Sequence, residues 1–105
     1  MLKIQYAVRQ DSLQLNLNGH AGAGKWGSDI VCAAASVLTY TAAAVAQQLF
    51  REGKLSARPR IKLESGSAWV ITENCEAARQ LMEVICTGYG LLAVRYPKNV
   101  LLLRQ

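Results

Sequence analysis

The feature that most constrains the fold is a change in the spacing of hydrophobic residues near Gly19. Before it, apolar and polar side chains alternate over residues 2–8 and 13–17, which is the two-residue period of half-buried β-strands. After it, residues 30–51 carry apolar side chains at steps of three and four, which is the period of an amphipathic helix. A polar turn at residues 10–12 joins the two strands. This part of the chain therefore predicts a β-hairpin followed by one long helix.

The second half of the chain repeats this order. Residues 60–64 and 68–72 are β-prone and flank a Ser-Gly-Ser turn. Asn74 is the predicted N-cap of a second helix that runs to about Arg95, and Pro97 prevents the helix from continuing. The apolar run at residues 100–103 predicts a last, buried strand. The order ββαββαβ predicts a single α+β domain over residues 1–105, with two helices on a mixed or antiparallel sheet.

The long first helix also predicts where its side chains point. Ser28 or Asp29 is the expected N-cap, and Gly53 is a fitting C-terminal stop. On a helical wheel, Cys32 lies nearly opposite the apolar face, and Ser36 follows one turn later on the same side as Cys32. We therefore expect Cys32 to point away from the core toward a cleft or solvent. The predicted apolar face runs through Ile30, Ala34, Val37, Leu38, Thr41, Val45 and Leu49.

The charge balance and the cysteine count narrow the classes of function. The net charge of +5, from 12 Lys and Arg against 7 Asp and Glu, is usual for a solvated surface and is compatible with an RNA-bound or ribosome-associated partner. The basic residues are scattered apart from Arg58, Arg60 and Lys62, so we expect no direct nucleic-acid binding. Three widely spaced cysteines and one histidine argue against a disulfide framework and against a zinc site. We therefore expect no bound metal.

The chain shows no targeting segment in its first residues. The segment MLKIQYAVRQ alternates polar and apolar residues and lacks the apolar core of a signal peptide. No apolar run approaches the roughly 20 residues of a membrane span. We therefore expect a cytoplasmic protein that makes no contact with membranes.

The residues with the clearest chemistry lie between Gly19 and Ser36, in the segment GHAGAGKWGSDIVCAAAS. It holds the only histidine, His20, just after the second strand, and Cys32 in the first turn of the long helix. A thiolate is a strong nucleophile, and a neighbouring imidazole can remove the thiol proton. The N–H groups and the dipole at a helix start favour a thiolate and can stabilise an oxyanion. The alternative is a buried, inert cysteine and a surface histidine.

Three other features of this segment each have two interpretations. Asp29 either caps the helix or orients His20. Trp26 either anchors the loop on the body of the protein or contacts an apolar peptide. The glycines at positions 22, 24 and 27 are either plain turn formers or the hinges of a flap that opens for a bulky substrate.

The same segment resembles the Prp family, the bacterial ribosomal-processing cysteine proteases. The resemblance is carried by Gly19-His20-Ala21, by the run from Trp26 to Ala34, by Ser36, and by the segment GLLAVRYP at residues 90–97. It covers essentially the whole domain. It implies a catalytic dyad in which Cys32 is the nucleophile and His20 the general base. The further motif positions are Gly19, Gly27, Asp29 and Ser36.

The resemblance also implies a function. Members of this family remove a short N-terminal extension from large-subunit ribosomal protein twenty-seven, which supports ribosome assembly. The expected substrate is an apolar and aromatic N-terminal peptide, the expected assembly is a homodimer, and no metal or cofactor is needed. The residues alone leave two alternatives open. One is a non-catalytic ribosome- or RNA-binding module, suggested by the charge, and the other is an obligate dimer with only a structural role.

Overall fold

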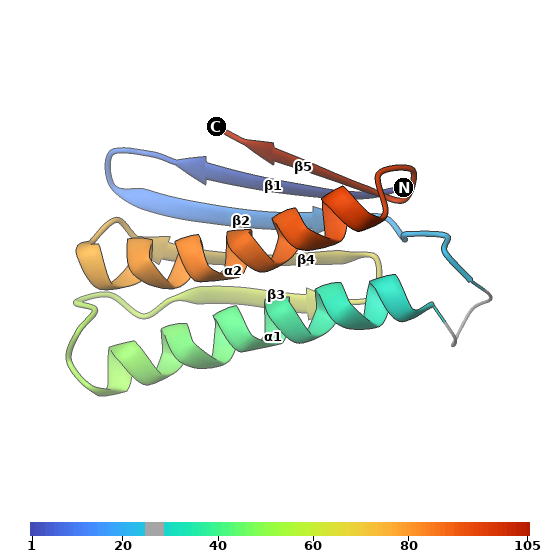
Figure 1. Ribbon diagram of the computed structural model, residues 1–105. Coiled ribbons are helices and arrows are strands. Elements are labelled where there is room, and N and C mark those ends of the chain that lie inside the picture. Colours follow the sequence, from blue (N-terminus) through green and yellow to red (C-terminus); the bar gives the residue numbers. More distant parts are fainter. Residues whose placement is uncertain (25–28) are drawn as a thin grey trace.

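The structure is a computed structural model that describes residues 1–24 and 29–105. Its elements follow the predicted ββαββαβ order and form an α+β fold, so the predicted fold class is confirmed (Figure 1). The elements are β1 (Leu2–Val8), β2 (Ser12–Asn18), α1 (Ile30–Arg51), β3 (Arg60–Glu64), β4 (Ser67–Glu73), α2 (Glu76–Arg95) and β5 (Val100–Arg104).

The five strands form one mixed sheet in the order β3-β4-β2-β1-β5. β1 pairs with β5 in parallel, and the other neighbouring strands are antiparallel. Both helices lie on the same face of the sheet (Figure 1). The alternation read from the sequence places Ile4 opposite Leu17 and Tyr6 opposite Leu15, so one apolar row faces the helices.

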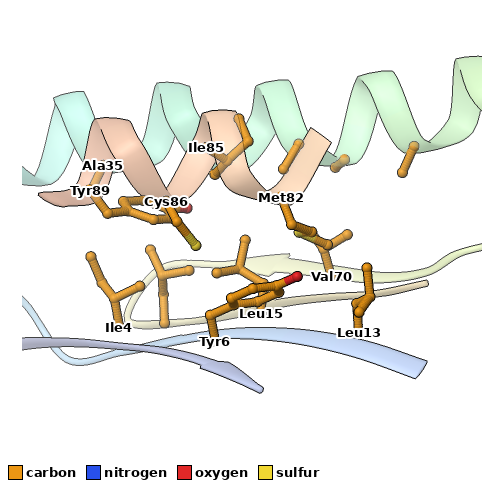
Figure 2. Packing of buried hydrophobic residues seen from close by; sticks show 14 of the residues in the cluster. Ile4, Tyr6, Leu13, Leu15, Ala35, Val70, Met82, Ile85, Cys86 and Tyr89 are labelled. Atoms are coloured by element: carbon orange, nitrogen blue, oxygen red, sulfur yellow. The ribbon is translucent and has the colours of Figure 1, made fainter. Parts of the chain in front are cut away.

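The core lies between this apolar row and the inner side of the helices. Figure 2 shows side chains from the strands and from α2 pointing toward one another across this space. Burying a large apolar side chain contributes about 1.5–3 kcal/mol, so this layer is the main source of stability. Inside it, the hydroxyls of Tyr89 and Thr39 lie 2.6 Å apart and satisfy each other. The largest apolar side chains that are nearly or fully buried include Ile4, Tyr6, Leu13, Leu15, Val70, Met82, Ile85 and Tyr89.

The orientation predicted for α1 is wrong. Ile30 and Val37 are 68% and 63% exposed, although both were expected in the core. The helix packs its small side chains inward, because alanine lets it approach the sheet and α2 closely. With this phase Cys32 lies about 50° from the centre of the buried face, not opposite it. Cys32 is half-buried and packs against the core. The buried residues of α1 are Val31, Ala35, Thr39, Ala42, Ala43 and Ala46.

Most helix ends follow the sequence, with one exception. Asp29 is the N-cap of α1 and Gly53, with φ +75°, follows its last turn, both as predicted. The N-cap of α2 is Cys75 rather than Asn74. Asn74 instead donates its side-chain amide to the Arg9 carbonyl at 2.7 Å, so its polar group ties the start of α2 to the β1–β2 turn.

The helix α1 is long and apolar enough, by length and composition, to cross a membrane. The expectation that no apolar segment reaches that length is therefore wrong for this helix. The reason is its alanine content, since the alanines at 33–35 and 42–44 extend the apolar character without a charged residue. In this fold α1 lies on the sheet and contributes to the core, which is a second setting in which a helix is strongly apolar.

Candidate active site

The residues predicted to carry the chemistry meet in one cleft of about 200 Å³. It lies where the end of β2, the first turns of α1 and the β3–β4 turn come together. His20, Cys32, Gly19 and Ser36 all line it. The remaining wall is formed by Leu2, Leu17, Ala35, Thr39, Tyr40, Leu63, Glu64, Ser65, Gly66, Ser67 and Ala68.

Gly19 directs the chain from β2 to His20. Its φ of +92° belongs to the left-handed region, and a Cβ at this position would lie 2.5 Å from the carbonyl oxygen of Met1. Only glycine fits such a position without displacing the backbone. Its N–H donates to the carbonyl of Gly66 at 3.0 Å. His20 therefore leaves the sheet at a fixed point and stands exposed at the rim of the cleft.

The sulfur of Cys32 accepts a hydrogen bond from the residue that follows His20. The N–H of Ala21 donates to Sγ at 3.2 Å. Ala21 is buried, and its carbonyl accepts a hydrogen bond from the Asn99 side-chain amide at 2.9 Å. This hydrogen bond fixes the position of the sulfur relative to the end of β2. The strand end and the helix start are thus joined at Cys32 and at the residue that follows His20.

Asp29 acts as a cap in this structure. Its Oδ1 accepts from the N–H groups of Val31 and Cys32, each at 3.0 Å, and its Oδ2 accepts from Ala23 at 3.1 Å. The hydrogen bond from Cys32, together with those from Ala23 and Val31, holds the pKa of this carboxyl below its usual value. Because Asp29 accepts from the N–H groups of Val31 and Cys32, these two donors are already hydrogen-bonded and are not free to stabilise an oxyanion.

The other predicted residues have different outcomes. Ser36 lies one turn after Cys32, is half-buried and lines the cleft as expected. Trp26 and Gly27 lie outside the described residues, and so does the central part of the predicted flap. Gly22 has a φ of +69°, which is typical of a turn glycine.

The sequence did not indicate two neighbours of the site, Gly66 and Asn99. Gly66 lies in the β3–β4 turn, and a Cβ there would be only 2.9 Å from Nε2 of His20. Its only signal in the sequence is a glycine between two serines, which predicts a turn and nothing more. Asn99 precedes β5, and its contact with Ala21 depends on the parallel pairing of β1 with β5.

The other two cysteines lie away from the cleft. Cys75 is the N-cap residue of α2, and Cys86 lies on the buried face of that helix. Burial raises the pKa of the Cys86 thiol. Over residues 1–24 and 29–105, no group of three or more His, Cys, Asp or Glu side chains is arranged to hold a metal ion. Cys32 is thus the thiol that the fold presents to a cleft.

A half-buried thiol in the first turn of a helix, with an imidazole in the same open cleft, is the arrangement of a thiol-dependent hydrolase. The chain matches the family model described as cysteine protease Prp over residues 1–101 and belongs to that family. It is therefore a cysteine protease. No curated protein matches the chain significantly.

Solved structures share the fold over the whole chain. One is the S. aureus ribosomal processing protease Prp in complex with a covalently linked product peptide, with a TM-score of 0.80, 22% identity and full coverage of both chains. The same protease with a substrate peptide gives a TM-score of 0.73 at 22% identity, again with full coverage of both. A Streptococcus mutans protein has a TM-score of 0.70 and 26% identity, over 100% of this chain and 96% of its own.

The non-catalytic alternative loses its support. The family is one of enzymes, and two of the three clustered basic residues, Arg58 and Lys62, make contacts within the chain. The guanidinium of Arg58 lies 4.9 Å from the ring centre of Phe50. Lys62 donates to Ser67 at 3.3 Å and pairs with Glu64 at 3.6 Å.

Proposed function

We propose that this protein is an endopeptidase that removes the N-terminal extension of large-subunit ribosomal protein twenty-seven and so supports ribosome assembly. Cys32 is the nucleophile and His20 the general base. The observation that carries the proposal is the shared cleft of these two side chains, with the hydrogen bond from Ala21 to the Cys32 sulfur. The S. aureus structures support a ribosomal substrate, because that relative is a ribosomal processing protease solved with peptides. Such a substrate places the reaction in the cytoplasm.

The chemistry follows from the two groups. His20 takes the thiol proton, and the thiolate of Cys32 attacks the scissile carbonyl carbon. The tetrahedral intermediate collapses to a thioester as His20 gives the proton to the leaving amine. His20 then takes a proton from water, the hydroxide attacks the thioester, and the carboxylate product leaves as the thiol is restored. Each step uses groups of this chain and water.

The walls of the cleft favour an apolar side chain in the substrate. Leu2, Leu17, Leu63 and Ala68 all line it, and Leu63 is 40% exposed at its edge. An apolar or aromatic side chain bound there would remove both surfaces from water, whereas a charged side chain would lose its hydration. This supports an apolar and aromatic peptide as the substrate.

We also propose that the outer face of the helix layer joins two copies of the chain. Val84, Leu91 and Val94 of α2 are 69–83% exposed and lie opposite the buried side of that helix. Ile30 and Val37 of α1 are exposed in the same way. A row of exposed apolar side chains suits a symmetric contact with a second copy. Leu91→Glu should turn a dimer into a monomer by analytical ultracentrifugation, whereas Leu101→Glu on the opposite sheet face should not.

The cleavage assay tests the function directly. Ribosomal protein twenty-seven with an apolar N-terminal extension should be cut once, as read by mass spectrometry of the products. Cys32→Ala should abolish the cut and Cys32→Ser nearly so, whereas the matched control Cys75→Ala should cut at the wild-type rate. Cutting by Cys32→Ala at the wild-type rate would contradict the proposal.

A further inference from the structure

The β3–β4 turn touches the imidazole of His20 through a residue without a side chain. A Cβ built on Gly66 would lie 2.9 Å from Nε2 and 3.4 Å from Cε1 of His20. Real Cβ atoms essentially never approach another heavy atom as closely as the first of these distances. The ring therefore lies against the bare backbone of the turn, in space that any other residue would fill.

The same glycine also holds the main chain that carries the imidazole. The carbonyl of Gly66 accepts a hydrogen bond from the N–H of Gly19, 3.0 Å away. Gly66 thus contacts the end of the His20 ring and the residue before His20. Because His20 is exposed, it has few other packing partners to select one rotamer. The turn is the surface that limits where the ring can go.

We propose that Gly66 is a positioning residue for the reaction: it leaves the space in which the His20 imidazole rests and so keeps the ring in the cleft with Cys32. The inference rests on the proposed role of His20 as the base and adds what sets the position of that base. A methyl group on residue 66 would displace the ring rather than the backbone, because Nε2 is the far end of a rotatable side chain. A small displacement of a catalytic group costs rate much more than stability.

The chain offers a matched control for this test. Gly53 has a φ of +75°, nearly the same as the +76° of Gly66, but nothing lies within 4 Å of a Cβ built on it. Gly66→Ala and Gly53→Ala therefore place an alanine at nearly the same unfavourable φ. Only Gly66→Ala adds a contact with His20.

The experiment compares the two variants by three readouts. Both should lose a similar amount of thermal stability. Gly66→Ala should lower kcat for peptide cleavage by roughly tenfold or more, with a smaller change in KM, whereas Gly53→Ala should retain the wild-type kcat. Because the chain has a single histidine, its imidazole proton resonances in NMR are unambiguous. They should shift in Gly66→Ala and stay in place in Gly53→Ala.

The outcomes separate this inference from the proposed function. Unmoved histidine resonances in Gly66→Ala, or a kcat equal to that of Gly53→Ala, would overturn the role of Gly66 while leaving the dyad intact. Full activity of His20→Ala would instead overturn the proposed function. If Gly66→Ala is too unstable to assay, the thermal stability of the double variant Gly66→Ala with His20→Ala tests the contact instead. Removal of the imidazole should restore stability to the level of Gly53→Ala with His20→Ala, and no restoration would contradict the contact.

Discussion

The N–H of Ala21 donates a hydrogen bond to the sulfur of Cys32 at 3.2 Å, and this bond links the end of β2 to the start of α1. It lies next to His20, so the same backbone segment carries the proposed base and contacts the proposed nucleophile. The Ala21 carbonyl is held in turn by the side chain of Asn99. The conformation of the backbone at His20 and Ala21 therefore depends on Asn99, which lies near the C-terminal end of the chain.

Removal of the Asn99 side-chain amide should lower activity more than removal of a similar amide far from the cleft. Asn99→Ala frees the Ala21 carbonyl and loosens the segment that presents His20 and meets Cys32. We expect the cleavage rate to fall by roughly tenfold. Initial rates on a peptide substrate measure this.

Asn74→Ala is the matched control for that variant. Asn74 also donates its amide to a distant carbonyl, that of Arg9 at 2.7 Å, but at the opposite end of the sheet from the cleft. Each variant should cost about 1 kcal/mol of unfolding free energy. Equal activity of the two would show that Asn99 has no special role at the site.

The cap formed by Asp29 should make stability depend on acidic pH. Its pKa is lowered in the folded chain, chiefly by the N–H of Cys32, so the cap contributes fully above its usual pKa of 3.8. The contribution is lost as the pH falls through the lower, folded value. Thermal unfolding should therefore show less loss of stability at acidic pH in Asp29→Asn than in wild type.

Glu73 provides a comparison for the effect of Asp29 on stability at acidic pH. The Ser56 hydroxyl and the Ala57 N–H lower the pKa of its carboxyl, yet it lies outside the cleft. Glu73→Gln should also reduce the loss of thermal stability at acidic pH. Only Asp29→Asn should change the alkylation rate of Cys32. If Asp29→Asn lost as much thermal stability at acidic pH as the wild type does, the role of the cap charge would be refuted.

The three cysteines should react with iodoacetamide in a set order near neutral pH. Cys32 should be fastest, because it lines the open cleft at a helix start. Cys86 should be slowest, because it is 2% exposed and its burial raises the pKa of its thiol. Peptide mapping after timed labelling measures the order. Labelling of Cys86 at the rate of Cys32 would contradict this account of the site.

Gly19 should be far less replaceable than Gly22. Gly19→Ala meets both a φ of +92° and a contact of 2.5 Å with the Met1 carbonyl oxygen. Gly22 has a φ of +69° and open space around it. We expect Gly22→Ala to cost about 1 kcal/mol and Gly19→Ala several times more. Chemical denaturation compares them, and equal losses would show that the contact with Met1 relaxes freely.

Periodicity was sufficient to predict the elements but not the orientation of α1. Strand alternation and helix spacing are local properties, so residues such as Leu13 and Leu15 indicated both the element and its buried side. For α1, a hydrophobicity pattern selected Ile30 and Val37, whereas the packed structure selected Ala35 and Ala42. Side-chain size, which sets how closely a helix can approach, decided the face.

The site was predictable only where it is local in sequence. His20 and Cys32 share one segment, and their motif indicated them together. Gly66 reaches the cleft through the pairing of β2 with β4, and Asn99 reaches Ala21 through the pairing of β1 with β5. No local pattern carries those contacts. The same limit applies to the capping role of Asp29, for which the sequence offered two interpretations and the hydrogen bonds select one.

In the proposed mechanism, peptide cleavage passes through a thioester on Cys32 that forms with the help of His20. Rapid quenching of the reaction with an N-terminally extended ribosomal substrate, followed by peptide mapping by mass spectrometry, measures it most directly. We expect an acyl adduct on the peptide that contains Cys32, formed much more slowly in His20→Ala. Cleavage that proceeds with no adduct on Cys32, or with the adduct on Cys75, would contradict it.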